Sequence, residues 1–337
     1  MKKKLAILMS AALLIASLAG CGQKSGGNAS GGNAGSNGGG AGFPAGKNIE
    51  IIVGFAAGSA TDLNARMLAT YLEDELGTSV TIANREGGGG EIGWTALANA
   101  KADGYTIGVI NSPAFQLPIQ NPDTCKFTID SFIPLGNMVT DPGVILVGAD
   151  SPINNIEDLV AAAKANPGGV TVSVTGMNTS EARAINTLAK TFDVQFQLIP
   201  YDGSTEGINA LIGNHVQVSC QNVGDILPQL AQGNVKAIAV GSKERSDLLP
   251  DVPTYGEQGL DFNQFSMRTF CVPAGTDPEI VAVLEAGIAA VMENPDFVKQ
   301  AEEANVLLDY QDSASMIQVY KDLDAQWRAE WEVTPWA

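Results

Sequence analysis

The sequence predicts an α/β fold of two lobes, each a mostly parallel sheet flanked by helices, with a hinge between them. First, short apolar runs alternate with helical patterns through nearly the whole chain after residue 42, which is typical of parallel βαβ units. Second, glycine-rich turns join the first strands to the helices that follow. Third, the alternation gives way near residues 132–147 to two successive extended segments, which predicts a lobe boundary there. Roughly 300 residues follow residue 42, enough for two lobes.

The N-terminal residues have the pattern of an export signal. Three lysines at positions 2–4 precede an apolar run over residues 5–19 that is short for a membrane span. The run ends in Leu-Ala-Gly-Cys at Cys21, which resembles the bacterial lipobox, whose cysteine becomes the lipidated first residue. The alternative is an uncleaved anchor helix. We expect a signal peptide at 1–20, and a lipidated Cys21 with a flexible Gly/Ser/Asn linker at 21–42, which predicts an extracytoplasmic protein anchored to the cell membrane by lipid.

The chain is acidic, with 19 basic and 37 acidic residues and a formal net charge of −18. Loss of the signal's three lysines would make the mature chain more acidic still. Nucleic-acid binding needs a basic face, so we expect no nucleic-acid partner. An acidic protein can still hold an anion, because backbone amides act locally while distant surface charges are screened over ~8–10 Å.

The first lobe reads as a βαβαβ unit. Its expected elements are strand 50–53, helix 61–76, strand 80–83, helix 92–100 and strand 105–110. Helical spacing is clear in the first helix, whose apolar face comprises Leu63, Met67, Leu68, Tyr71, Leu72 and Leu76. Gly77 follows as a stop signal.

A second unit follows the extended region, which contains the turn-like sequence Asp141-Pro142-Gly143. Its expected elements are helix 156–165, strand 170–174, helix 181–191, strand 195–200, helix 205–212, strand 216–220, helix 223–230 and strand 237–240. An extended segment at 265–272 then crosses back, and helices 278–292 and 314–331 pack on the first lobe. We therefore expect lobe 1 to comprise residues 43–143 plus 271–337 and lobe 2 residues 144–270, with the ligand in the cleft between them.

Two glycine-rich turns are the strongest functional signal. Residues 54–62 and 84–90 each leave a strand and enter a helix, so unpaired backbone N–H groups and helix dipoles should point at one spot. The two turns should lie side by side at one sheet edge, which predicts capture of a small carboxylate. Polar turns after the second-lobe strands, at 175–180, 201–205 and 221–222, should face the same cleft.

Other chemistries have weaker support. Gly88, Gly90 and Gly93 satisfy the dinucleotide pattern G-x-G-x-x-G, but they follow the second strand and no ribose-binding acid ends the next one. The single histidine, His215, lies in a tight connection, and no G-x-S-x-G elbow is present, so a hydrolase triad is not indicated. Paired carboxylates are so common in this chain that glycosidase-type chemistry is neither supported nor excluded. We expect no enzyme activity and no cofactor.

The cysteines after Cys21 do not form a metal motif. Cys125, Cys220 and Cys271 lack C-x-x-C spacing, allow at most one disulfide, and no metal site is indicated. We expect Cys220 and Cys271 to be buried free thiols. Arg268 stands among apolar residues in the returning strand, where it needs either a structural Asp or Glu partner or a ligand carboxylate.

The whole mature chain resembles the substrate-binding component of tripartite tricarboxylate transporters, the Bug family. The family's first turn reads close to P-F-x-P-G-G-S-T-D, and residues 54–62 read G-F-A-A-G-S-A-T-D, followed by Arg66. The family's N-R-P-G-A-G-G and D-G-Y-T are matched by residues 84–90 and 103–106. Later matches are Ala165-Asn166-Pro167-Gly168, Pro200-Tyr201-Asp202-Gly203-Ser204, Asp251-Val252-Pro253-Thr254 and Val272-Pro273-Ala274-Gly275-Thr276. Departures at Ala57, Ser59, Ala60 and Glu86 put the ligand specificity in doubt.

The resemblance implies a periplasmic-binding-protein-like fold of type II, in which the lobes close over an organic acid that is delivered to membrane permease subunits. A secreted enzyme acting on a small carboxylate and a ligand-sensing receptor are the alternatives. Carried over by position, the expected ligand-binding residues are Ala57, Gly58, Ser59, Ala60, Thr61, Asp62, Gly87, Gly88, Gly89, Gly90, Thr175, Gly176, Tyr201, Gly203 and Ser204. Arg268 joins them as a candidate, and Asp62, which repels a carboxylate, is assigned to the helix start. We expect a monomer.

Magnitudes favour a ligand with polar groups at both ends. A charge-assisted hydrogen bond contributes ~1.5–3 kcal/mol, and association costs at least ~4 kcal/mol in lost motion. Micromolar affinity needs about −8.2 kcal/mol, so both lobes must contribute. The expected ligand is therefore a dicarboxylate, a tricarboxylate or an amino acid.

Overall fold

The computed structural model describes residues 42–333 except 113, 115 and 116. By their contacts, residues 39–337 belong to one compact unit. The expected export signal at 1–20, the lipidation site at Cys21 and the linker up to residue 41 lie outside the described residues. Within the described part of the chain, every helix is too short or too polar to cross a bilayer.

The first sheet has a parallel half and an antiparallel half. Its strands are β1 (Ile49–Val53), β2 (Val80–Asn84), β3 (Thr106–Asn111), β4 (Phe132–Gly148), β9 (Phe265–Pro273) and β10 (Leu308–Asp312). β1 pairs in parallel with β2 and β3, whereas β9 runs antiparallel to β3 and β4, and β10 antiparallel to β4. The helices of this half are α1 (Ala60–Leu76), α2 (Glu91–Ala98), α3 (Leu117–Gln120), α8 (Pro278–Glu293), α9 (Pro295–Glu303) and α10 (Ser313–Val333).

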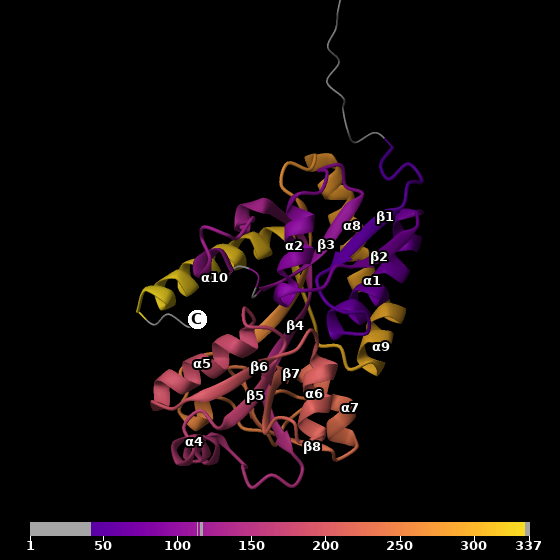
Figure 1. Ribbon diagram of the computed structural model, residues 1–337. Coiled ribbons are helices and arrows are strands. Elements are labelled where there is room, and N and C mark those ends of the chain that lie inside the picture. Colours follow the sequence, from indigo (N-terminus) through magenta and orange to yellow (C-terminus); the bar gives the residue numbers. More distant parts are fainter. Residues whose placement is uncertain (1–41, 113, 115–116, 334–337) are drawn as a thin grey trace, which may run out of the picture. The chain divides into compact units, whose positions relative to one another are not determined.

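The second sheet is built around the C-terminal half of β4 (Figure 1). It adds β5 (Val170–Val174), β6 (Phe196–Pro200), β7 (Val218–Asn222) and β8 (Val235–Val240). β5 pairs in parallel with β6 and β7, and β4 runs antiparallel to β7 and β8. Its helices are α4 (Ile156–Ala165), α5 (Ser180–Phe192), α6 (Ser204–Ile212) and α7 (Val223–Ala231).

Side chains at the helix ends set the boundaries. Ser59 precedes α1 and its hydroxyl accepts a hydrogen bond from the Asp62 amide, while Thr179 does the same for α5 through the amide of Ala182. α1 ends at Gly77, whose φ of 62° is the left-handed conformation that glycine adopts without strain. Capping therefore fixes where both helices begin, at the end of the turns that follow β1 and β5.

Apolar side chains cover both faces of each sheet. On the first sheet, one cluster joins Ile51 and Leu72 to Phe297, and a separate cluster contains Trp94 and Trp327. The second sheet is likewise covered by two clusters, which are centred on Val172 with Leu188 and Tyr255, and on Leu146 with Ile208 and Leu211. Burial on both faces explains why the parallel strands read as continuous apolar runs.

The expected turn at Asp141-Pro142-Gly143 is wrong, because β4 continues through it as one strand of 17 residues. The backbone groups that a turn would use are hydrogen-bonded to neighbouring chain segments instead. The Gly143 amide donates to the Gln264 carbonyl at 2.8 Å, and the Gly143 carbonyl accepts from the Gly241 amide at 2.7 Å. Here tertiary pairing overrides a local turn preference.

The predicted α/β class is confirmed, and the expected strands and helices are present with small shifts at their ends. The return of residues 265–273 to the first sheet is also observed, as β9 pairs with β3 and β4. Three elements were not expected from the sequence, namely α3, α9 and β10. The three cysteines are free, with Cys220 and Cys271 buried as expected and Cys125 half-buried.

Burial should control the reactivity of these thiols. It raises the pKa of Cys271 to about 12 and that of Cys220 further, so neither forms the reactive thiolate in the folded chain. In a chain lacking residues 1–42, we expect a thiol reagent at pH 8 to label Cys125 first, and to label Cys220 and Cys271 only after denaturant is added. Mass spectrometry of the labelled peptides measures the order, and rapid labelling of Cys220 in the native protein would contradict the burial described.

Candidate functional site

The two glycine-rich turns lie against each other at the carboxyl ends of β1 and β2. A Cβ atom added at Gly54 would lie 2.9 Å from the carbonyl oxygen of Gly90, and one added at Gly93 would lie 2.6 Å from the Gly54 Cα. This approach is closer than any side chain permits, so glycine is required at Gly54 and Gly93. The parallel pairing of β1 with β2 brings the turns together, because parallel strands end at the same sheet edge.

The first turn contains two residues that line the cavity at the start of α1, Ala60 and Thr61. The Gly58 amide is already used, since it donates to Asp62 Oδ2 at 2.8 Å. The amides of Ala60 and Thr61 belong to the first turn of α1, where helix geometry provides no intrahelical acceptor. Together with the positive end of the helix dipole, Ala60 and Thr61 can hold a carboxylate.

Asp62 does not line the cavity, and its carboxylate instead holds the first turn in place. Its carboxylate accepts hydrogen bonds from the Arg66 guanidinium, the Gly58 amide and the Asn84 side chain. Burial raises the pKa of Asp62, but these hydrogen bonds outweigh it and hold the pKa below its ordinary value. Asp62 therefore stays ionised and fixes the turn to α1.

A cavity lies between the two sheets, and the N-cap residues of four helices line it. These residues are Ser59 of α1, Thr179 of α5, Gly203 of α6 and Asn222 of α7. The cavity has about 450 Å³ of space not filled by atoms, including its opening to solvent. The positive end of a helix dipole favours an anion, so each of these helix N-termini favours one unless an acidic side chain in its first turn offsets it.

The cavity is narrow where the two halves meet. Gly89 of the second turn faces the loop after β5, and a Cβ atom at Gly89 would lie 3.3 Å from Thr179 Cγ2. Conversely, a Cβ atom at Gly176 would lie 3.0 Å from the Gly89 Cα. The described conformation is therefore closed at this point, with glycine on both sides of the contact.

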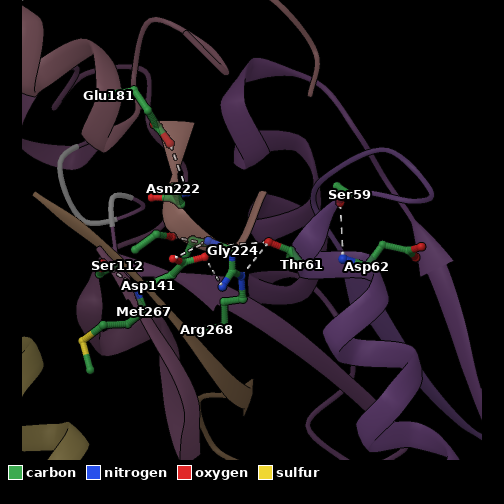
Figure 2. Close-up of polar contacts among 12 residues, drawn as sticks. Ser59, Thr61, Asp62, Ser112, Asp141, Glu181, Asn222, Gly224, Met267 and Arg268 are labelled. Atoms are coloured by element: carbon green, nitrogen blue, oxygen red, sulfur yellow. Dashed lines mark hydrogen bonds and ion pairs between the residues drawn. The ribbon is translucent and has the colours of Figure 1, made fainter. Parts of the chain in front are cut away.

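Arg268 is part of a buried ion pair at the junction of β9 and β4. Its Nη1 and Nη2 lie 3.1 and 3.0 Å from Asp141 Oδ2, and the two side chains are 3% and 2% exposed. Asp141 Oδ1 accepts a hydrogen bond from the Gly224 amide at the start of α7, and Arg268 Nε donates to Thr61 Oγ1 at 3.4 Å (Figure 2). Arg268 therefore has a structural partner and also lines the cavity.

Two acidic side chains line the second-lobe wall. Glu181 lies in the first turn of α5 and Asp225 in the first turn of α7. Burial raises the pKa of Glu181, and hydrogen bonds from nearby hydroxyls only partly oppose this. Burial also raises the pKa of Asp225 to about 7, although the charge of Arg268 lowers it. Ionising either group therefore costs free energy at these positions.

The expected site residues divide into two groups. Those that line the cavity are Ser59, Ala60, Thr61, Gly89, Thr175, Gly203, Ser204 and Arg268. Those that belong to the same turns without lining it are Ala57, Gly58, Asp62, Gly87, Gly88, Gly90, Gly176 and Tyr201. The second group shapes the turns, as Asp62 does through the Gly58 amide.

Sequence reasoning missed several lining residues. On the first-lobe side these are Trp94, Asn111 and Ser266, and on the second-lobe side Glu181 and Asp225. Four further lining residues, Phe55, Thr179, Ser180 and Asn222, lie within the predicted turns but were not named as ligand-binding residues. The available signal was the run of polar residues directly after each strand, which indicates a cleft-facing turn but not which side chain points inward.

These features define a two-domain binding-protein fold with a cavity between its two sheets. The model of the tripartite tricarboxylate transporter family receptor matches residues 64–331, and the chain belongs to this family. It is 33% identical over 252 residues to the UPF0065 protein in the gbd 5′ region of Cupriavidus necator, covering 74% of this chain and 76% of that protein. It is 31% identical over 262 residues to BugT of Bordetella pertussis, covering 76% and 79%.

Solved structures agree with this assignment. The periplasmic binding protein BugD is similar with a TM-score of 0.79 and 29% identity, covering 85% of this chain and 96% of that one. A TctC solute-binding protein from Polaromonas is similar with a TM-score of 0.65 and 28% identity, covering 84% and 96%. The expected Bug-family membership and the periplasmic-binding-protein fold are therefore confirmed.

Breaking the Arg268–Asp141 pair should be costly. We expect Asp141→Asn or Arg268→Met to lower the free energy of unfolding by ~3–5 kcal/mol. Asp141→Asn leaves the buried charge of Arg268 without its partner, and Arg268→Met leaves the buried charge of Asp141 without its partner. Denaturant unfolding measures the loss. The matched control is Arg245→Ala, which breaks the exposed pair with Glu257 and should cost far less. Equal losses in the buried and exposed pairs would contradict a stabilising role for the junction.

Proposed function

We propose that the protein is an extracytoplasmic solute-binding lipoprotein that captures a small organic carboxylate between its lobes. It delivers this ligand to a tripartite tricarboxylate-type membrane permease. The single observation that carries the proposal is that the N-cap residues of four helices line one cavity. Backbone amides and helix dipoles bind a carboxylate without a cationic side chain. The Bug relatives support the same class of function.

The proposal includes the domain organisation expected from the sequence. Lobe 1 comprises residues 43–143 plus 271–337, and lobe 2 comprises residues 144–270. The pairing of β4 supports the boundary near residue 143, because Phe132 to Pro142 pair with β9 in the first sheet and Gly143 to Gly148 pair in the second. At the other boundary, β9 pairs in the first sheet from Phe265 onward. The chain would then be a monomer held at the membrane by a lipid on Cys21, with no cofactor.

The alternatives are a secreted enzyme that uses the same cleft and a receptor that reports ligand occupancy to a membrane sensor. The single histidine is exposed in the α6–β7 connection and is not among the described residues that line the cavity, which favours binding over hydrolysis. A binding protein should leave its ligand unchanged.

A thermal-shift screen with a panel of small mono-, di- and tricarboxylates and amino acids tests the proposal. We expect one or more members to stabilise the protein by about 2.7 kcal/mol at a hundredfold excess over Kd. Chromatography of the incubated ligand should show no consumption. Stabilisation followed by turnover would favour the enzyme, and no stabilisation by any carboxylate would contradict the proposal.

Closure of the cleft gives a second test. We expect Gly89→Ala to weaken binding of the stabilising carboxylate at least tenfold, because its Cβ would press on Thr179 Cγ2 and keep the lobes apart. The matched control is Gly233→Ala, which has a similar positive φ (70° against 67°) but no atom within 4 Å of the added Cβ. Both variants should lose ~1–2 kcal/mol of stability through backbone strain. Equal affinity in the two variants, measured by titration calorimetry, would contradict this closure.

A further inference from the structure

The cavity is asymmetric in charge. The only cation among the described residues that line it is Arg268, and Asp141 takes up that charge through two contacts of 3.0 and 3.1 Å. Glu181 and Asp225 line the same cavity and have no ion-pair partner among the described residues. Buried carboxylates are normally paired, so two of them facing one space favour a positively charged group there.

The four helix ends differ accordingly. In α1, Asp62 is turned away from the cavity and is neutralised by Arg66, so the amides of Ala60 and Thr61 remain available to an anion. In α5 and α7 the first turn already carries a carboxyl group that faces the cavity, namely Glu181 and Asp225. An anion is therefore favoured at the α1 end and opposed at the α5 and α7 end.

An unpaired hydrogen-bond acceptor points to the same conclusion. Asn222 donates through Nδ2 to Glu181 Oε1 at 3.3 Å (Figure 2), which fixes the orientation of its amide. Its Oδ1 is buried, and no group among the described residues donates to it. A ligand carboxylate offers only acceptors, whereas an ammonium group offers three donors and a positive charge. Asn222 and Glu181 can thus bind an ammonium group together.

Resting on the proposed function, we propose that Glu181, Asn222 and Asp225 bind a ligand ammonium group, so that the ligand is an amino-acid-like zwitterion. Its carboxylate binds at the Ala60 and Thr61 amides of the opposite wall. Acids that carry only negative groups would bring a second charge against Glu181 and Asp225. The ligand class is therefore narrower than small carboxylates in general.

Matched ligand pairs that differ only in the ammonium group test this inference. The pairs are L-aspartate with succinate, L-glutamate with glutarate, and L-alanine with propionate, titrated by calorimetry at pH 7.5 into the wild-type protein. We expect the amino member of at least one pair to bind at least tenfold tighter than its partner. Equal or tighter binding of the partners in every pair that binds would overturn the inference while leaving the proposed function intact. Binding by no member of any pair would also overturn the inference, whereas the proposed function is decided by the wider thermal-shift panel.

Two charge-removing variants assign the effect to these residues. We expect Glu181→Gln and Asp225→Asn each to reduce the preference for the amino member at least tenfold. The matched control is Glu206→Gln, which removes an acidic group from the first turn of α6 at an exposed position outside the cavity lining. It should leave the preference unchanged. Glu181→Asp, which keeps the charge, should retain part of it. A preference that survives in both cavity variants would overturn the assignment.

The pH dependence separates an ionised Asp225 from a protonated one. Arg268 of β9, Asp141 of β4 and Glu181 of α5 are the charged groups that act on Asp225. With a pKa of about 7, Asp225 gains a proton as the pH falls from 8 to 6. We expect affinity for the amino member to fall over this interval, by up to about tenfold per pH unit below the pKa. In Asp225→Asn the affinity should change much less with pH. Affinity that rises as the pH falls would contradict the inference, because it would mean that a protonated Asp225 donates to a carboxylate.

Discussion

The buried contact between Arg268 and Asp141 connects the parts of the molecule on which binding depends. It joins β9 to β4 where β4 passes from one sheet to the other, and it reaches the N-termini of α1 through Thr61 and of α7 through the Gly224 amide. Because both side chains are almost fully buried, removing either one leaves the other as a buried charge without a partner. The pair thus fixes two of the four helix ends that line the cavity.

The same contact decides the electrostatics of the cavity. In the proposed function backbone amides recognise the anion, because Asp141 takes the charge of Arg268 and an acidic protein can supply amides without a basic surface. Glu181 and Asp225 then dominate the opposite wall. The proposed cleft, with amide donors at one end and carboxyl groups at the other, would select ligands by the arrangement of their charges as well as by their size.

Much of the fold followed from the sequence, because apolar periodicity and glycine turns report directly on buried strands and helix starts. Asp141-Pro142-Gly143 was misread as a turn because its backbone partners, Gln264 and Gly241, are far away along the chain. The residues that line the cavity were predicted only at the level of turns. Which residue faces the cavity depends on the rotation of each helix about its axis, so Glu181 and Asp225 were missed while Asp62 was noticed. Glycine patterns locate amides, but a single sequence carries no comparable signal for side-chain direction.

A crystal structure of the protein with bound L-aspartate would test the central claim most directly. We expect a ligand carboxylate oxygen within ~2.7–3.2 Å of the amide nitrogen of Ala60 or Thr61, the ammonium nitrogen facing Glu181 and Asn222, and the Arg268–Asp141 contact intact. A carboxylate held by the Arg268 side chain, with that ion pair broken and the α1 amides free of the ligand, would contradict the account.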